Sequence, residues 1–478
     1  MTSNFDRVRA AAIDGRLHNI YHRQVQLERL CAALISNISN IQEAIATDYG
    51  HTPAEIAVEY HLAISAVKKC YAELKPKEAH QQEYLIANGT DAPENRVPAG
   101  IVYIEPTSHA MLYSVVVPLA SALAAGNCVI LLLENNLRAV PSLLRKLLTS
   151  ALDADVFAVA ASPVKDVLIL DHAICVLQNG VEQVPRQNQL THRSSRSVVA
   201  VVDRTADLRL AAHDLVAARF SFGGRSPYAP DCVLVNEFAK KDFLEAVASE
   251  CASLSTSVEG NMRKTTSRSR VGEQLETLRK AHSSLGVVLQ DLDFAVVDTA
   301  DRDSLLSQRT DASIMVIHSI KSLDDAIDLV GSSTEDSCLA AYHFGNPATG
   351  QYLAQFIASE TAYINHIPRE LLVGPVVPSG LGLIATERDP TKLFSLRRPA
   401  FITPATGSKA LADVLGGQSP RLLLEDATTP LAEFKRHPAG GVGFFEQGFL
   451  INAGIIVSSF LTVSVAGSVW SWRHCRAM

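Results

Sequence analysis

Residues 98–130 read PAGIVYIEPTSHAMLYSVVVPLASALAAGNCVI, and this stretch sets the fold class. Its two apolar runs, at 100–105 and from 128 onward, flank an apolar segment of helical length at 114–126. A strand that is apolar along nearly its whole length is buried on both faces, as in a parallel sheet covered by helices. The stretch therefore predicts a strand–helix–strand unit that opens an α/β domain.

The same alternation continues toward the C-terminus in two sets. Its apolar strands and amphipathic helices are expected at 140–152, 156–161, 173–177, 197–203, 208–220, 232–235, 240–254, 313–319, 323–331 and 339–345. Before the first set, apolar residues at three- and four-residue steps predict one amphipathic helix over 25–45. A second helix is expected to begin at Pro53 with Thr52 as its N-cap. The chain thus reads as two α/β domains, each with a doubly wound parallel sheet.

Composition limits the possible partners and sites. The formal charge of −7 provides no basic surface for nucleic acid. The eight cysteines occur singly, without a CxxC pair, so neither a zinc site nor a disulfide framework is expected. The histidines show no metal-ligand spacing, and a reducing compartment is expected for the main body.

One segment near the C-terminus differs from the rest. Residues 449–472 contain no charged side chain, and as a helix they would extend about 36 Å, enough for a ~30 Å hydrocarbon core. Basic residues flank the segment, and Trp470 and Trp472 lie where an interfacial aromatic belt would fall. We expect a tail anchor, with the endoplasmic reticulum as the membrane and the body facing the cytosol. The alternative is a helix packed on the body or on a second subunit.

Several motifs in collinear order resemble the aldehyde dehydrogenase superfamily, and they span roughly residues 10–405. They are YHRQVQLERL at 21–30, AIATDYGHTPAEIAVEY at 44–60, the stretch 98–130, and DRTADLRLAAHDLVAARFSFGGRSPYAPDCVLV at 203–235. The resemblance implies a cofactor-type Rossmann-like domain, degenerate here (1–75 and 100–195), and a catalytic-type domain (196–383). It also implies an oligomerisation arm (76–99 and 384–404), followed here by a linker (405–448) and the tail anchor.

The catalytic positions of that family have changed. The family's nucleophilic cysteine aligns with Pro227, whose side chain has no nucleophilic atom. Its side-chain oxyanion donor, an asparagine, aligns with His109, and its general base falls near Arg193. Cys232 lies five residues past Pro227 at the start of an apolar strand, where a buried, inert thiol is expected.

The family's cofactor positions have changed as well. The ribose-binding lysine becomes Leu132, the glycine–serine turn under the pyrophosphate becomes Leu177 and Gln178, and the second ribose clamp becomes Arg309. We therefore expect no bound cofactor. NADP is the one exception, because the guanidinium of Arg309 could attract its extra phosphate.

The candidate catalytic residues are His109, Arg225 and Tyr228, and the candidate substrate contacts are Phe222, Pro227 and Thr107. A histidine at the oxyanion position could donate to a carbonyl and polarise it. Each of these residues also has a structural alternative. His109 could be a loop histidine bonded to backbone or water, Arg225 a solvated arginine, Tyr228 a packed tyrosine and Phe222 a core residue.

Three functions remain possible at this point. The first is a non-redox enzyme that cyclises or isomerises a hydrophobic carbonyl compound, for example by intramolecular cycloaddition in terpenoid or polyketide secondary metabolism. The second is a non-catalytic pseudoenzyme that acts as a scaffold. The third is an aldehyde dehydrogenase that uses another thiol, such as Cys232. The expected partners are a hydrophobic small molecule, the membrane, and a second copy in a homodimer.

Overall fold

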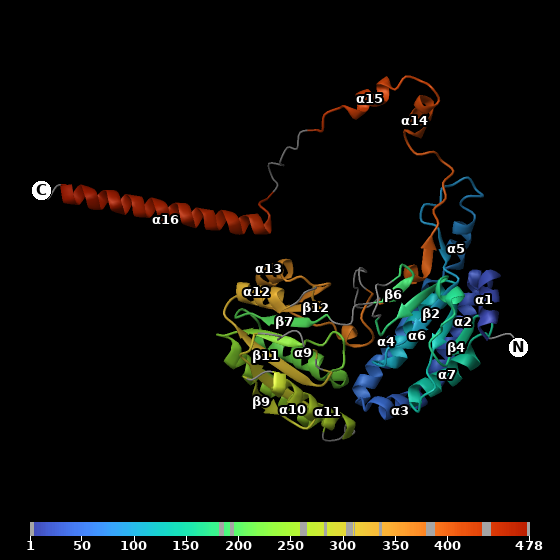
Figure 1. The fold of residues 1–478 in the computed structure, drawn as a ribbon, viewed down its shortest axis with the longest axis horizontal. Helices are drawn as coiled ribbons and strands as arrows, with labels where there is room; N and C mark the ends of the chain where they lie inside the picture. The colour runs from blue at the N-terminus through green and yellow to red at the C-terminus, as the bar shows by residue number, and fades with distance from the viewer. Residues whose placement is uncertain are drawn as a thin grey trace. The chain divides into compact units, whose positions relative to one another are not determined.

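The computed structural model describes residues 4–180, 186–191, 196–258, 265–281, 284–302, 309, 311–333, 337–378, 388–432 and 441–475. The chain divides into two compact units, Met1–Thr403 and Pro404–Met478. The first unit contains both large sheets, and their order and direction confirm the α/β fold with parallel sheets (Figure 1).

The first sheet has five parallel strands in the order β4-β3-β2-β5-β6. Its strands are β2 (Ile101–Glu105), β3 (Cys128–Leu132), β4 (Phe157–Ala160), β5 (Ala173–Leu177) and β6 (Gln189–Thr191). Helices α6 (Met111–Ala124), α7 (Ala139–Ala151) and α8 (Val167–Leu170) connect them. The connections after β2 and β5 run in opposite directions, so the strand order reverses between these neighbours. In such sheets the crevice at the carboxyl ends of these two strands is where ligands bind.

The second sheet has seven strands in the order β13-β12-β7-β8-β11-β10-β9, parallel except for the antiparallel pair β10–β9. Its strands are β7 (Val198–Val202), β8 (Cys232–Asn236), β9 (Gly286–Gln290), β10 (Ala295–Thr299), β11 (Ile314–Ile320), β12 (Ala340–Phe344) and β13 (Ala362–Ile364). Its helices are α9 (Leu208–Phe220), α10 (Lys240–Val258), α11 (Thr265–Ala281), α12 (Leu323–Ser333) and α13 (Pro347–Phe356). Strands β9 and β10 were not predicted from the sequence.

The N-terminal region consists of helices. They are α1 (Asn4–Ile13), η1 (Arg16–His18), α2 (Ile20–Ser36), α3 (Ile38–Tyr49), α4 (Pro53–Glu73) and α5 (Pro76–Glu83). The prediction of one helix over 25–45 is wrong, because the helix ends at Asn37, whose side-chain amide donates to the carbonyl of Ala33 at 2.9 Å. The predicted start of α4 is confirmed: Thr52 caps it in a full capping box with Glu55.

A small antiparallel pair joins two distant parts of the first unit. Strand β1 (Arg96–Pro98) pairs with β14 (Ser395–Arg397), and an isolated bridge between Ala92 and Ala400 extends the pairing. Two one-turn helices, η3 (Arg369–Leu372) and η4 (Thr391–Phe394), lie in the same C-terminal part of the unit.

The second unit contains helices α14 (Ser408–Leu415), α15 (Arg421–Ala427) and α16 (Phe444–Cys475). Residues Phe444–Gly467 of α16 form a 24-residue stretch that is long and apolar enough to cross a membrane. The apolar helix predicted at 449–472 is therefore present and begins earlier than expected. The side chains of Trp470 and Trp472 lie outside the described residues.

Candidate functional site

Two glutamates of α4 hold the segments that meet at the predicted site. Glu55 and Glu59 lie one turn apart, so their side chains leave the same face of the helix. A carboxylate oxygen of Glu55 accepts a hydrogen bond from the backbone N–H of Phe222 at 2.6 Å. Glu59 accepts from the backbone N–H groups of Leu112 and Tyr113 at 3.0 and 3.4 Å. Glu59 therefore caps the N-terminus of α6 from a neighbouring helix.

Glu59 is also the most deeply buried carboxylate of this region. It is 0% exposed, and burial raises its pKa to about 7, although its two backbone hydrogen bonds favour the ionised form. Its second carboxylate oxygen has no hydrogen-bond partner in the described part of the chain. The pKa of Glu59 therefore lies close to neutral pH, where the carboxyl group changes its charge.

The loop after α9 has an unusual backbone at the centre of the site. Phe222 adopts a left-handed conformation with φ 52°, and the next two residues, Gly223 and Gly224, have φ 66° and 72°. The resemblance places asparagine at the position of Phe222, and asparagine tolerates this conformation better than phenylalanine. The hydrogen bond to Glu55 helps to keep the Phe222 backbone there. Strain of this kind is typical of functional loops.

His109 presents a hydrogen-bond acceptor to its surroundings and not the expected donor. Its Nε2 lies 2.9 Å from the carbonyl oxygen of Leu372, which can only accept, so Nε2 carries the proton. Nδ1 then has a lone pair and no partner among the described residues. Burial lowers the pKa of His109 to about 3, so the ring is neutral at physiological pH. The predicted role in polarising a carbonyl does not fit this orientation.

Aromatic rings and a guanidinium surround Phe222. The ring of His109 lies edge-on to Phe222 at 6.0 Å, and His51 does so from the other side at 5.3 Å. His51 stacks on Tyr49, and the guanidinium of Arg225 lies 5.5 Å from the centre of the Tyr49 ring. The structure therefore brings three predicted residues, His109, Phe222 and Arg225, into one cluster.

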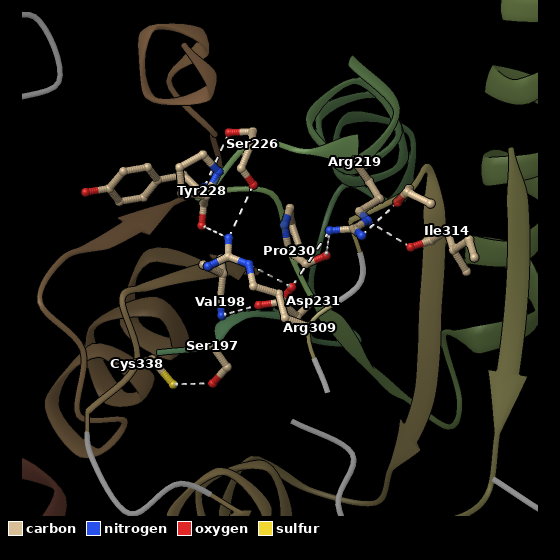
Figure 2. A network of polar contacts seen from close by, with 12 residues as sticks. Ser197, Val198, Arg219, Ser226, Tyr228, Pro230, Asp231, Arg309, Ile314 and Cys338 are labelled. Carbon is tan, nitrogen blue, oxygen red and sulfur yellow. Dashed lines mark hydrogen bonds and ion pairs between the residues drawn. The ribbon is translucent and has the colours of Figure 1, made fainter. Parts of the chain in front are cut away.

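The loop that contains Pro227 is fixed by two arginines, the buried Arg219 and the partly exposed Arg309 (Figure 2). Arg309 donates to the carbonyl oxygens of Ser226, at 3.3 Å, and of Pro227. Its Nε also lies 3.9 Å from a carboxylate oxygen of Asp231. Arg219 reaches the same carboxylate at 3.8 Å and donates at 2.8 Å to the carbonyls of two residues in or just before β11. Arg309 therefore binds the protein's own loop, which argues against a role in binding the extra phosphate of NADP.

The remaining predicted residues have structural contacts. Tyr228 is buried: its hydroxyl accepts from the N–H of Val377 at 3.2 Å, and the guanidinium of Arg388 lies 4.9 Å from its ring centre. The backbone N–H of Thr107 donates to the side chain of Gln178. Neither residue contacts the cluster around Phe222 in any interaction described above. Arg193, the position aligned with the general base, lies outside the described residues.

Gln178 fills the crevice between the ends of β2 and β5. Its side-chain oxygen accepts from Thr107 N–H at 3.0 Å, and its amide donates to the carbonyl of Ser114 at 2.8 Å. That carbonyl needs a donor because Pro118, four residues later in α6, has no N–H. Gln178 therefore supplies the hydrogen-bond donor that Pro118 lacks, and it links the ends of β2 and β5 to α6.

These residues do not fit a nicotinamide dinucleotide. Leu132 and Leu177 are buried and apolar where the resemblance implies polar contacts, and Gln178 occupies the turn beneath the expected pyrophosphate.

A pocket of about 220 Å³ lies between α4 and α6, beside the cluster. Its lining includes apolar residues of both helices and five charged residues: Leu62, Ala66, Lys69, Glu73, Tyr113, Val117, Glu370, Arg388 and Asp389. Tyr113 lies four residues after His109, so the pocket extends from the start of α6 along its length. None of the six predicted site residues lines this pocket or the small pocket beside Gln178.

Two buried thiols in the described part of the chain, Cys232 and Cys70, are poorly suited to act as a nucleophile. Cys232 is 0% exposed, and burial raises its pKa far above the ordinary value. Cys70 lines the pocket, but burial raises its pKa to about 11, and its sulfur lies 3.5 Å from the Ser121 hydroxyl. Both thiols are protonated at neutral pH and are weak nucleophiles.

Sequence reasoning missed Glu55, Glu59 and Asp389. The two glutamates carried a detectable signal, because they share a face of α4 with the apolar residues Ile56 and Ala63. Acidic residues on a buried helix face need a partner, which predicts a structural or functional contact. Asp389 follows an arginine in a polar segment, and no periodicity marks it as buried.

Comparison with known proteins identifies relatives of one kind. Residues 5–174 match the model of the aldehyde dehydrogenase family. A 4,4'-diaponeurosporen-aldehyde dehydrogenase of Staphylococcus aureus is 27% identical over 244 residues, which is 48% of this chain and 53% of that enzyme. The bovine aldehyde dehydrogenase family 3 member B1 is 23% identical over 402 residues, 79% of this chain and 86% of that protein.

Solved structures share the fold. A substrate-bound S. aureus AldH has a TM-score of 0.69 at 21% identity, covering 86% of this chain and 98% of its own. The NADP complex of a glyceraldehyde-3-phosphate dehydrogenase from Methanocaldococcus jannaschii has a TM-score of 0.64 at 17% identity, covering 84% and 93%.

Proposed function

Because this chain belongs to the aldehyde dehydrogenase family, we propose that it uses the family's scaffold for a reaction without a redox step. The proposal rests on Pro227, which the resemblance places at the nucleophile's position, in a loop whose carbonyls are bonded to Arg309. A proline cannot form the covalent intermediate that oxidation requires. Gln178 supports the proposal, since it fills the crevice in which the dinucleotide would bind.

The proposed substrate is a hydrophobic carbonyl compound, bound along the pocket between α4 and α6. Holding two reactive parts of one molecule in contact can contribute roughly 7–11 kcal/mol to a cyclisation. An isomerisation or an intramolecular cycloaddition rearranges bonds within the substrate, so it needs no oxidant, reductant or added atom. The setting would be terpenoid or polyketide secondary metabolism. The name of the S. aureus relative, which specifies an aldehyde substrate, supports the carbonyl.

His109 is the proposed contact to the substrate. Its neutral ring offers Nδ1 as an acceptor for a hydroxyl or enol of the substrate. The low pKa makes the ring a weak base, so its proposed role is to orient the substrate and not to carry a proton. Arg225, whose charge acts on His109, supplies the positive charge that favours a polarised carbonyl.

Mass spectrometry separates this reaction from oxidation. Purified protein would be incubated with unsaturated hydrophobic aldehydes, with and without NAD. The proposal expects a product of unchanged mass that forms equally in both samples. It also expects His109→Ala to slow that conversion while the thermal unfolding curve stays in place. A product that has gained one oxygen, together with NADH, would overturn the proposal.

A residual aldehyde dehydrogenase is the second candidate, favoured by the relatives' names. It would need a thiolate, and Cys70 is the described thiol that lines the pocket. Aldehyde-dependent NADH formation that is lost in Cys70→Ser would establish it. Loss of all activity in both assays would instead favour the scaffold role.

We further propose that α16 anchors the body to a membrane, with the endoplasmic reticulum as the membrane and the body in the cytosol, and that the β1–β14 arm joins two copies in a homodimer. The apolar stretch Phe444–Gly467 supports the anchor. Removing residues 449–478 should move the protein from the membrane pellet to the supernatant. A full-length chain that stays in the supernatant would disprove the anchor.

A further inference from the structure

The pocket between α4 and α6 contains a buried acidic group that the protein itself does not neutralise. Asp389 is 8% exposed and lines this pocket, and it also lines a small neighbouring one. Among the described residues no side chain or backbone group donates a hydrogen bond to its carboxylate, in contrast to the Glu55 and Glu59 carboxylates nearby. A buried carboxylate without a partner is unfavourable, so a ligand that supplies a donor would gain from it.

The adjacent arginine is not available as that partner. Arg388 is 3% exposed and donates to the backbone carbonyl of Pro375 at 2.5 Å and to that of Leu371 at 2.8 Å. Two further contacts, each of 3.3 Å, reach the carbonyls of Glu370 and Val373. Its guanidinium thus holds the turn at η3 together and forms no ion pair of 4.0 Å or less with Asp389.

The charges around the pocket favour a cation. Glu73 and Glu370 contribute two more carboxylates, so the lining contains three acidic side chains and two basic ones, Lys69 and Arg388. Lys69 lies 4.0 Å from Glu73 and is half exposed, so it is screened by water and directed to its neighbour on α4. Burial raises the pKa of Asp389 to about 6, which leaves it mostly ionised at neutral pH. The lining therefore carries an excess of negative charge around an apolar space.

A metal ion fits this pocket poorly, whereas an organic cation fits it well. No three histidine, cysteine or acidic side chains of the described residues come together as metal ligands. The volume of about 220 Å³ exceeds the 150 Å³ of an engineered cavity in another protein that binds benzene. A six-membered ring with a short ammonium arm therefore has enough room, with Leu62, Tyr113 and Val117 against its apolar part.

We propose that this pocket binds a protonated amine, held by the Asp389 carboxylate, on an otherwise apolar molecule. The proposal rests on the proposed function in one respect, since it adds an amine to the hydrophobic carbonyl compound. The substrate class then becomes an amino-carbonyl compound whose ammonium lies at Asp389. Its carbonyl end extends along α6 toward His109.

Binding of small probes tests the proposal without any turnover, so its failure is distinguishable from failure of the proposed reaction. The full-length chain in a neutral detergent would be titrated by calorimetry with benzylammonium, benzyl alcohol and benzoate. Benzylammonium should bind at least about ten-fold more tightly than benzyl alcohol, and benzoate most weakly, because only the cation pairs with Asp389. If the wild-type chain binds benzylammonium and benzyl alcohol with equal affinity, that result by itself overturns the proposal.

Three variants locate the effect. Asp389→Asn should weaken benzylammonium about ten-fold or more and leave benzyl alcohol within about two-fold. Glu73→Gln, which removes an exposed carboxylate from the rim of the same pocket, is the matched control and should change neither probe by more than about two-fold. Ala66→Phe fills the pocket and should abolish binding of both probes. Benzylammonium binding that survives Asp389→Asn or Ala66→Phe would contradict the assignment.

Discussion

The two sides of α6 differ in how their polar groups are used. On the side of the β2–β5 crevice, Gln178 is hydrogen-bonded within the protein. In the separate loop of Pro227, Arg309 and Asp231 are likewise bonded or paired. On the side of α4, a pocket remains, and Asp389 reaches it without a protein donor. We call these the closed and the open side, because in the described part of the chain the open side keeps a buried carboxylate with which a ligand could pair.

The comparison predicts that changes on the closed side cost stability, whereas changes on the open side cost affinity. The largest effect is expected at Gly224 in the site loop. A Cβ there would lie 2.3 Å from the backbone of Ala312, and φ is +72°. Gly224→Ala should therefore destabilise the protein by roughly 4 kcal/mol or more in a chemical denaturation curve. Gly223→Ala is the control, since it has a similar φ but an open surrounding, and about 1–2 kcal/mol is expected. Equal losses of stability in the two variants would show that the surrounding structure moves and relieves the clash at Gly224.

The next effect concerns Glu59, where the two sides meet. Its folded pKa of about 7 lies above the ordinary value of 4.5. The native state therefore binds the proton more tightly, and this contribution is complete below about pH 4.5 and is lost as the pH rises through 7. Glu59→Gln should remove about 3 kcal/mol of pH dependence between pH 4.5 and 8. Denaturation curves at several pH values measure it, with the exposed Glu73→Gln as a control that should parallel the wild type. A Glu59→Gln curve parallel to the wild type would refute the assignment.

A smaller loss is expected when the closed crevice is opened. Gln178→Ala leaves the N–H of Thr107 and the carbonyl of Ser114 without their partner, which should cost about 2 kcal/mol. NAD should still fail to bind in calorimetry, because Leu132 and Leu177 remain where the resemblance implies polar contacts. Micromolar NAD binding by the wild-type chain would disprove the cofactor-free hypothesis, and binding gained only by the variant would show that Gln178 alone excludes NAD.

The smallest effect on stability is expected on the open side. Asp389→Asn removes an ionised group that has no protein donor, so the free energy of unfolding should stay within about 1 kcal/mol of the wild type or rise. Thermal unfolding without ligand measures this. A loss of several kcal/mol would show that Asp389 has a protein partner after all, and the contrast between the two sides would disappear.

Much of the fold was predictable because it depends on local patterns. The strand at 173–177 and the helix at 208–220 are predicted with their observed bounds, since apolar runs and helical periodicity depend on neighbours in the sequence. The break at Asn37 was missed, because the apolar residues keep their helical spacing across it. The edge strand β9 is partly exposed, and only a short turn separates it from the buried strand β10, so the pattern of this pair is weaker.

The site was less predictable, because it depends on contacts between distant residues. Alignment identified Pro227 and His109, but the donor or acceptor role of His109 depends on a carbonyl 263 residues later. The burial of Asp389 depends on the turn that Arg388 forms with η3. No spacing within the sequence encodes such relations.

The arginine network of Figure 2 also bears on the order of folding. Arg219 ends α9, yet the carbonyls that receive its guanidinium lie 93 and 95 residues later, at Ala312 and Ile314. Closing a chain segment of that length is slow compared with forming a helix. The loop from Phe222 to Asp231 consequently acquires its final shape only when β11 has joined the sheet. During synthesis, the site of this protein is completed only after the ribosome has passed residue 314.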